Sequence, residues 1–271
     1  IAPGYAELTI ERRQVGSERP DLRLARWFGA ISPAAGEDDV LSAEDETYSA
    51  LRFVSWSTPE EFKEKLISVI AEELKLADVN DQSGFNRTLG ALTYNGYDYF
   101  NPTRDGRPGA VTRIESWQIL SPIRGMTFGV SDINRQIHEC FRANFVELAS
   151  RDRYRVIPKP AGEERIVYGD KVINLSNHRR DGNRVYPRDG AIGYLANGEI
   201  GIVVGQWKTA KMKMTPNIIK VEFASQQGFT YDFYGNDFKE EGDATLELAY
   251  ALTVHKAQGS QAKKVVLFEE R

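Results

Sequence analysis

A Pro-Lys-Pro run at residues 158–160 separates two parts of the sequence whose apolar patterns differ. Before it, strand-like runs such as residues 117–121 alternate with helical stripes, which is typical of a parallel α/β sheet. After it, short strand-like runs are separated by turns rich in Gly, Asn and Asp, and this pattern predicts a small β-barrel. The α/β pattern returns at Ala244. We therefore expect a barrel inserted into an α/β domain.

These patterns set the expected domain boundaries. An α/β domain is expected over residues 1–162, the barrel over 163–242, and a return to the α/β domain over 243–271. Four runs are expected to be barrel strands, at residues 171–176, 200–204, 218–223 and 229–233. Residues 80–113 are rich in Gly, Asn, Asp and Tyr with little periodicity, which predicts an irregular insertion.

Local signals place further elements in the first part. Residues 5–14 are expected to be extended, residues 51–56 alternate as a strand does, and helical spacing from Pro20 predicts a short helix. Thr58, followed by Pro, Glu and Glu, has the composition of a helix N-terminus. An apolar stripe over residues 130–148 predicts one long helix.

The composition is that of an ordinary soluble globular protein. The chain has 271 residues, 41% hydrophobic and 27% charged, which excludes a collagen, a disordered tail and a membrane-bound protein. Its one cysteine, Cys140, cannot form an internal disulfide, and one cysteine with three histidines does not suit a structural zinc site. We expect a cytoplasmic protein with no bound structural metal.

The net charge of −4 conceals an uneven distribution. Nine Lys and Arg residues and three acidic residues lie between Lys171 and Lys220, so this segment carries +6 and the rest carries −10. Arg179 and Arg180 lie in expected loops of the barrel, and Trp207 lies close to further basic residues. Cations with interspersed aromatic rings suit single-stranded nucleic acid, although a set of solvated loops has the same composition.

Known catalytic motifs are absent from the sequence, but residues 250–261 carry a distinctive run. There is no Walker A phosphate loop, no Gly-x-Gly-x-x-Gly and no His-Glu-x-x-His. The run reads Tyr-Ala-Leu-Thr-Val-His-Lys-Ala-Gln-Gly-Ser-Gln, and its side chains with the glycine suit the binding of phosphates. It closely resembles motif V of superfamily 1 helicases, particularly their RecD-like branch.

Three further segments resemble the same family in order and spacing. Residues 8–28 are similar to the opening of its second RecA-like domain, residues 119–137 to its strand, basic turn and helix, and residues 169–201 to the start of its inserted SH3-like barrel. The least similar part is residues 29–116.

The resemblance implies a C-terminal piece of an ATP-dependent DNA helicase, with a RecA-like sheet of the P-loop NTPase type and an SH3-like barrel. Walker A and Walker B would precede Ile1 and the last motif would follow Arg271, so we expect the isolated chain to be inactive. ATP and Mg²⁺ would be bound mainly by the absent first RecA-like domain. That domain, single-stranded DNA, and recombination or nuclease subunits are the expected partners.

The resemblance assigns residues to the nucleotide. Arg13 matches a catalytic arginine that reaches the γ-phosphate across the interdomain cleft. Arg12 replaces an aromatic residue that stacks on adenine, and a guanidinium can also stack. Gln261 replaces a glutamate that contacts the sugar. The expected ATP-binding set is completed by Arg124, Gln258, Gly259 and Ser260.

The expected DNA-binding set combines the resemblance with the basic segment: Thr253, His255, Lys256, Arg179, Arg180 and Trp207. Simpler roles are open for some residues, because Arg13 could pair with Glu7 or Glu11 and Arg124 could serve only to start a helix. His138 and Cys140 are expected to be structural. A non-enzymatic nucleic-acid-binding or docking module is the alternative to a motor, and an RNA helicase is a third possibility.

Overall fold

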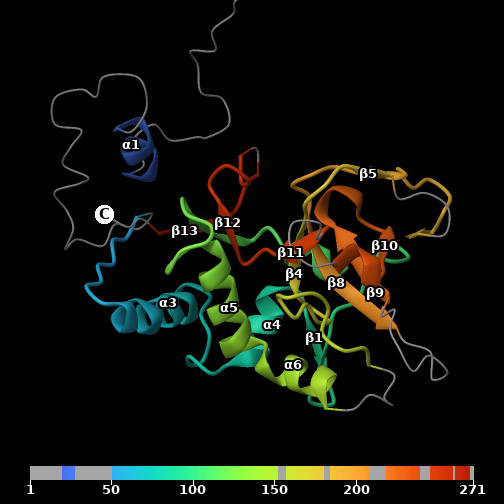
Figure 1. Cartoon of the computed structure of the whole chain (residues 1–271), viewed down its shortest axis with the longest axis horizontal. Helices are drawn as coiled ribbons and strands as arrows, with labels where there is room; N and C mark the ends of the chain where they lie inside the picture. Colours follow the sequence, from blue (N-terminus) through green and yellow to red (C-terminus); the bar gives the residue numbers. More distant parts are fainter. Residues whose placement is uncertain are drawn as a thin grey trace, which may run out of the picture. The chain divides into compact units, whose positions relative to one another are not determined.

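The computed structural model describes residues 20–27, 51–151, 157–179, 184–207, 218–238, 245–258 and 260–268 (Figure 1). Contacts within the chain divide it into two units, residues 1–57 and residues 58–271. The first unit contains helix α1 (Pro20–Trp27), as its sequence predicts. The prediction of a strand over residues 51–56 is wrong, because these residues have no regular secondary structure and an alternating pattern forms a strand only where a partner pairs with it. The segment 5–14 lies outside the described residues.

The second unit is a mixed α/β structure that contains a three-stranded parallel sheet. Its strand order is β12-β3-β13, with β3 (Trp117–Ser121) between β12 (Ala251–Thr253) and β13 (Lys264–Leu267). Helix α3 (Pro59–Glu73) begins as expected, since the Thr58 hydroxyl accepts a hydrogen bond from the backbone N–H of Glu61 at 3.1 Å. Helix α5 (Val130–Phe141) packs against β12 and against α3.

A larger antiparallel sheet follows in the chain. Its strand order is β11-β4-β8-β9-β10-β6, and in Figure 1 it lies beside the part that holds the helices and the parallel sheet. The strands are β4 (Lys171–Asn174), β6 (Val185–Tyr186), β8 (Ile200–Trp207), β9 (Ile218–Phe223), β10 (Thr230–Phe233) and β11 (Leu246–Leu248). All four strands expected in this region are present, but the described strands form an open sheet and no closed barrel.

Smaller elements complete the antiparallel region. Strands β5 (His178–Arg179) and β7 (Tyr194–Leu195) form a separate pair, and two short 3-10 helices are η3 (Ala224–Gln226) and η4 (Gly235–Phe238). Strand β11 still belongs to the antiparallel sheet, so the chain changes sheets after Leu248, a few residues beyond Ala244.

The prediction that residues 80–113 are irregular is wrong. The segment forms helix α4 (Gln82–Thr88), a hairpin of β1 (Leu92–Tyr94) and β2 (Tyr97–Tyr99), and the 3-10 helix η1 (Ala110–Arg113). Phe85 of α4 is completely buried and stacks on Phe141 of α5 with ring centroids 4.5 Å apart. Part of the segment therefore belongs to the core, and its elements are too short to produce a detectable period in the sequence.

The expected single helix over residues 130–148 is divided at Arg142, and helix α6 (Ala143–Ser150) follows. The Arg142 side chain is completely buried, where it donates to Asp170 at 2.9 Å and lies 4.2 Å from the Phe145 ring centroid. Asp170 also bonds His138 at 2.9 Å and accepts from the Tyr250 hydroxyl at 2.9 Å. Burial favours a neutral acid, but His138 and Arg142 outweigh it and hold the pKa of Asp170 below its ordinary value.

None of the helices in the described part of the chain has the length and apolarity needed to cross a membrane.

Candidate functional site

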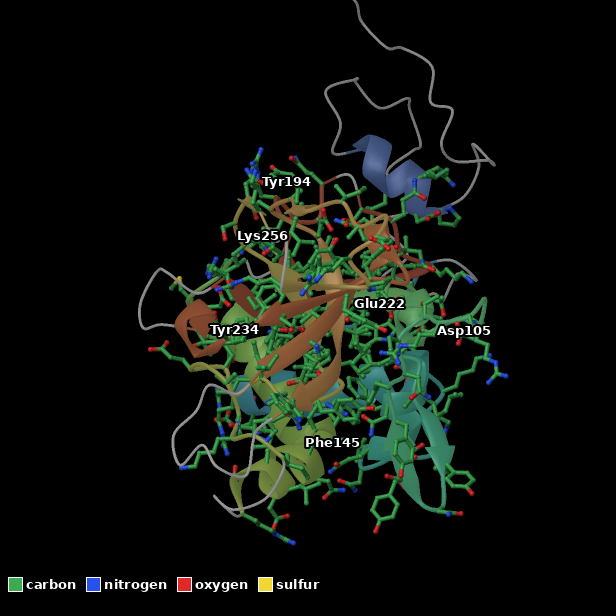
Figure 2. All side chains as sticks on the ribbon, turned by 90° about the vertical axis from the view of Figure 1, so that its right-hand side faces the viewer. Asp105, Phe145, Tyr194, Glu222, Tyr234 and Lys256 are labelled. Carbon is green, nitrogen blue, oxygen red and sulfur yellow. The ribbon has the colours of Figure 1, made fainter. Side chains whose placement is uncertain are left out.

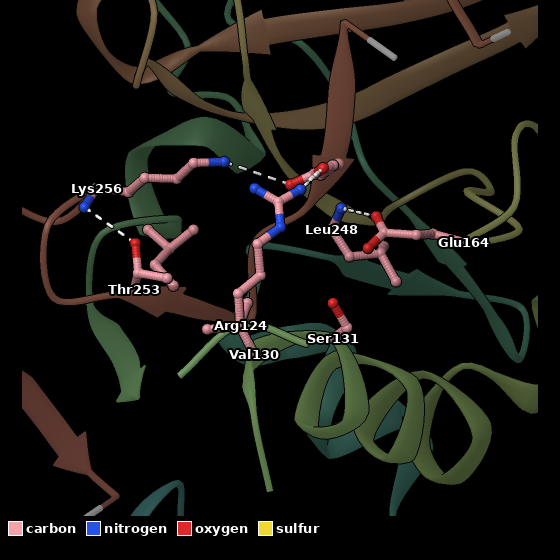
Figure 3. A pocket seen from close by; sticks show the side chains of 9 residues that line it. Arg124, Val130, Ser131, Glu164, Leu248, Thr253 and Lys256 are labelled. Atoms are coloured by element: carbon pink, nitrogen blue, oxygen red, sulfur yellow. Dashed lines mark hydrogen bonds and ion pairs between the residues drawn. The ribbon is translucent and has the colours of Figure 1, made fainter. Parts of the chain in front are cut away.

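A small, solvent-open pocket lies where strands β3 and β12 end, at the carboxyl edge of the parallel sheet (Figure 3). Neighbouring parallel strands present their following loops on the same edge, and α/β proteins commonly bind ligands there. The pocket is lined by Arg124, Val130, Ser131, Glu164, Glu247, Leu248, Leu252, Thr253 and Lys256. Three residues of the expected sites, Arg124, Thr253 and Lys256, therefore share one pocket.

The start of helix α5 positions Arg124. The backbone N–H groups of Val130 and Ser131 donate to the carbonyls of Ile123 and Arg124 at 2.9 and 3.1 Å, which folds the loop after β3 back onto the helix. Gly129 makes this fold possible, because a Cβ there would lie 2.7 Å from the carbonyl oxygen of Arg124. These amides are already bonded within the chain, so a ligand in the pocket must be held mainly by side chains.

Glu247 of strand β11 joins two cations of the pocket. One of its carboxylate oxygens pairs with the Arg124 guanidinium, and the other lies 3.4 Å from the Lys256 ammonium (Figure 3). The Thr253 hydroxyl accepts from the backbone N–H of Lys256 at 3.2 Å, which fixes the turn after β12. The resemblance assigns Arg124 to ATP and Lys256 to DNA, whereas in the structure both contact the same carboxylate.

Glu164 closes the other side of the pocket. It lies in a tight turn between Ala161 and Ile166, and its carboxylate accepts from the backbone N–H of Leu248. Burial and, to a smaller extent, the nearby Glu247 carboxylate raise the pKa of Glu164 to about 7, against the opposing effect of the Leu248 hydrogen bond. Near neutral pH this group is therefore divided between its neutral and charged forms.

The two glutamates are functional candidates that the sequence did not reveal. Glu247 is 123 residues from Arg124 in the chain, and only the approach of β11 to the parallel sheet joins them. No local signal separates Glu164 from its neighbour Glu163, which is exposed in the structure. A raised pKa in a cleft marks a candidate site, but it depends on burial that only the fold creates.

The chemistry of the pocket suits the binding of an anion. The side chain of Arg124 is 53% exposed and that of Lys256 24%, so both cations can be reached by an anion from solvent. The Ser131 and Thr253 hydroxyls can donate to the same ligand. The lining contains no histidine or cysteine, and its two carboxylates belong to Glu164 and Glu247.

The other expected residues of motif V lie outside this pocket. His255, Gln258, Ser260 and Gln261 are exposed in the segment between β12 and β13, and none of them lines the pocket. Arg12, Arg13, Arg180 and Gly259 lie outside the described residues. The described part of the expected ATP set thus does not form a cradle for a triphosphate and its Mg²⁺.

The basic segment offers less free charge than its net +6 suggests. Lys171 is completely buried, donates to the Trp117 carbonyl at 2.8 Å, and burial lowers its pKa to about 7. Arg184 pairs with Asp237 at 3.1 Å and Lys220 with Asp232 at 2.7 Å. Each of these three side chains thus already has a partner within the chain, and only Lys171 is buried.

Two residues of the expected DNA-binding set remain accessible in this segment. Arg179 on β5 is exposed, and Trp207 at the end of β8 is 50% exposed. The basic positions 208, 211 and 213 lie outside the described residues. The described ranges contain no cluster of three or more His, Cys, Asp or Glu side chains that could hold a metal ion.

No family model matches this chain, and no curated protein matches it at a significant level.

Proposed function

We propose that this chain is part of an ATP-dependent DNA helicase of the RecD-like superfamily 1 type. In that role it contributes part of the single-stranded DNA track and the second face of the ATP cleft. The main support is the position of the run 250–261, which passes from strand β12 into a turn at the carboxyl edge of the parallel sheet, where Arg124, Thr253 and Lys256 meet. A track for a single strand needs cations and hydroxyl donors at such an edge.

The topology also agrees with this proposal. The antiparallel sheet is formed by a segment that leaves the α/β part after helix α6 and returns to it at β12. An SH3-like barrel inserted into a second RecA-like domain would have this connectivity. We propose that the parallel strands belong to such a RecA-like sheet and that the open antiparallel sheet is the core of such a barrel.

At the pocket, the phosphate backbone of a single strand replaces Glu247 as the partner of Arg124 and Lys256. Glu247 then acts as the resting partner of both cations and keeps them in place while the strand is absent. In the whole protein, ATP hydrolysis would supply the free energy for movement along the strand. No step of hydrolysis is assigned to the described residues, because they do not form a triphosphate cradle.

A non-enzymatic nucleic-acid-binding module is the second candidate, and it is favoured because the described residues expected to bind ATP do not come together in the pocket. The reading frame upstream of Ile1 discriminates between the two. A Gly-x-x-x-x-Gly-Lys-Ser/Thr run followed by an apolar strand that ends in acidic residues supports the motor, and its absence supports the module.

For the purified 271-residue chain, we expect no ATP hydrolysis above background, with or without single-stranded DNA, because the sequence contains no Walker A loop. A phosphate-release assay checks this, with the longer protein that includes the upstream segment as the comparison. DNA-stimulated hydrolysis by the 271-residue chain itself would contradict the division of the ATP site between two domains.

A further inference from the structure

The hairpin of β1 and β2 exposes four large side chains on one face. Leu92 pairs with Tyr99 and Tyr94 with Tyr97, so these residues alternate on the strands and share a face. The exposed fraction is 63% for Leu92, 68% for Tyr94, 69% for Tyr97 and 42% for Tyr99. In Figure 2 the hairpin is the teal strand pair at the lower right, and ring side chains project from it into solvent. We call Leu92, Tyr94, Tyr97 and Tyr99 the tyrosine face.

The hairpin is held rigidly from its other side. Asp98 points toward helix α4, where it accepts from Ser83 at 3.1 Å and from Asn86 at 2.8 Å, and it also accepts from Thr93 at 2.6 Å. The turn at Asn95 and Gly96 has positive φ angles of 50° and 78°, as a tight two-residue hairpin turn requires. The pairing of the two strands therefore fixes the positions of the three tyrosine rings. The one carboxylate of the hairpin, that of Asp98, points to the opposite side.

The segment that carries the tyrosine face, residues 80–113, has more exposed cations than exposed acids. All four arginines between residues 80 and 113 are exposed: Arg87, Arg104, Arg107 and Arg113. Of the three aspartates in this segment, only Asp105 is exposed, because Asp81 caps helix α4 and Asp98 bonds to it. Exposed rings on a segment with an excess of exposed guanidinium groups suit a polyanion that carries flat, stackable groups.

We infer that the tyrosine face is a stacking platform for the bases of single-stranded nucleic acid, separate from the pocket at the carboxyl edge. Both views place the hairpin well away from the pocket: β1 lies far from the end of β12 in Figure 1, and Lys256 lies far from the hairpin in Figure 2. The inference rests on the proposed function in one respect only, that the ligand is a nucleic acid. The two sites bind different parts of the strand, the pocket its phosphates and the platform its bases.

Two oligonucleotides of equal length, oligo(dT) and a fully abasic strand, test this inference with the 271-residue chain. Tyr94→Ala/Tyr97→Ala should weaken the binding of oligo(dT) by about tenfold or more and leave the binding of the abasic strand unchanged. Tyr94→Phe/Tyr97→Phe keeps the rings and should bind oligo(dT) as the unchanged chain does. Fluorescence anisotropy gives the affinities, and urea unfolding midpoints verify that the variants fold.

Three outcomes would overturn the platform, and each leads to a different conclusion about the tyrosine face and the pocket. Equal affinity of the unchanged chain and the alanine variant for oligo(dT) would exclude the platform and leave the pocket in place. A fall in molecular mass of the DNA-free alanine variant, with its DNA affinity unchanged, would assign the face to self-association. No binding of either strand by the unchanged chain would overturn the platform and the proposed DNA track together.

Discussion

Glu164 is the residue whose environment most affects the chemistry of the pocket. Its half-buried carboxyl lies near Glu247 and accepts from the Leu248 amide, and its pKa is raised to about 7. When Glu164 is neutral, the two cations of the pocket face only one negative charge. When it is ionised, the pocket contains as many carboxylates as cations. The attraction of the pocket for an anion should therefore weaken as the pH rises through neutrality.

The raised pKa also links Glu164 to stability. The native state holds its proton up to about pH 7, whereas the unfolded chain loses it near 4.5, so the stability that this proton provides is lost as pH rises between these values. Glu164→Gln removes the titration and keeps an acceptor for Leu248. We expect the variant to gain about 2 kcal/mol relative to the unchanged chain between pH 5 and pH 8.

Urea unfolding at several pH values checks this gain, with Glu163→Gln as the exposed neighbouring control. Stability curves of Glu164→Gln and the unchanged chain that stay parallel from pH 5 to pH 8 would contradict the account of Glu164.

Among the elements, the loop between β3 and α5 matters most for the site. The loop holds Arg124 in place because its carbonyls accept hydrogen bonds from the first backbone N–H groups of α5. Gly129 lies between these bonded groups in the chain. The backbone at Gly129 is not left-handed, with φ at −75°, so the requirement for glycine is one of space. Within the same loop, Gly125 has nothing within 4 Å of a built Cβ and provides a matched comparison.

Gly129→Ala should destabilise the chain by about 1–3 kcal/mol, because its Cβ would press on the backbone carbonyls of Arg124 and Met126. It should also weaken binding of single-stranded DNA, since Arg124 must move. Gly125→Ala should change both quantities little. Thermal or urea unfolding with an anisotropy titration measures both variants, and indistinguishable behaviour of the two would show that the loop does not position Arg124 in this way.

Elements with a local signal could be predicted from the sequence. The Thr58 cap and the strand over residues 117–121 are correct because a capping box and a continuous apolar run need no distant partner to be recognised. The division of α5 from α6 was missed because the apolar stripe continues past Arg142, whose buried partners come from other segments. The sequence named Arg124, Thr253 and Lys256 as candidate residues but did not predict that they share a pocket, and Glu164 and Glu247 reach that pocket only through the tertiary fold.

At the scale of the second unit, buried polar contacts tie the two sheets together. Asp170 precedes β4 of the antiparallel sheet and bonds Tyr250, which precedes β12 of the parallel sheet. The next residue, Lys171, donates from β4 to the Trp117 carbonyl of β3 at 2.8 Å. The pocket lies at this junction, since Glu247 comes from one sheet and Thr253 from the other. A ligand in the pocket would therefore contact residues of both sheets.

The salt dependence of single-stranded DNA affinity tests the central claim, that the carboxyl edge of the parallel sheet binds phosphates, most directly. The 271-residue chain is compared with Arg124→Ala, Lys256→Ala and, as a control on helix α3, Lys63→Ala. Each of the first two should weaken binding and lower the slope of log affinity against log salt by about one, while the control keeps both values. Slopes that coincide for all four proteins would contradict the claim.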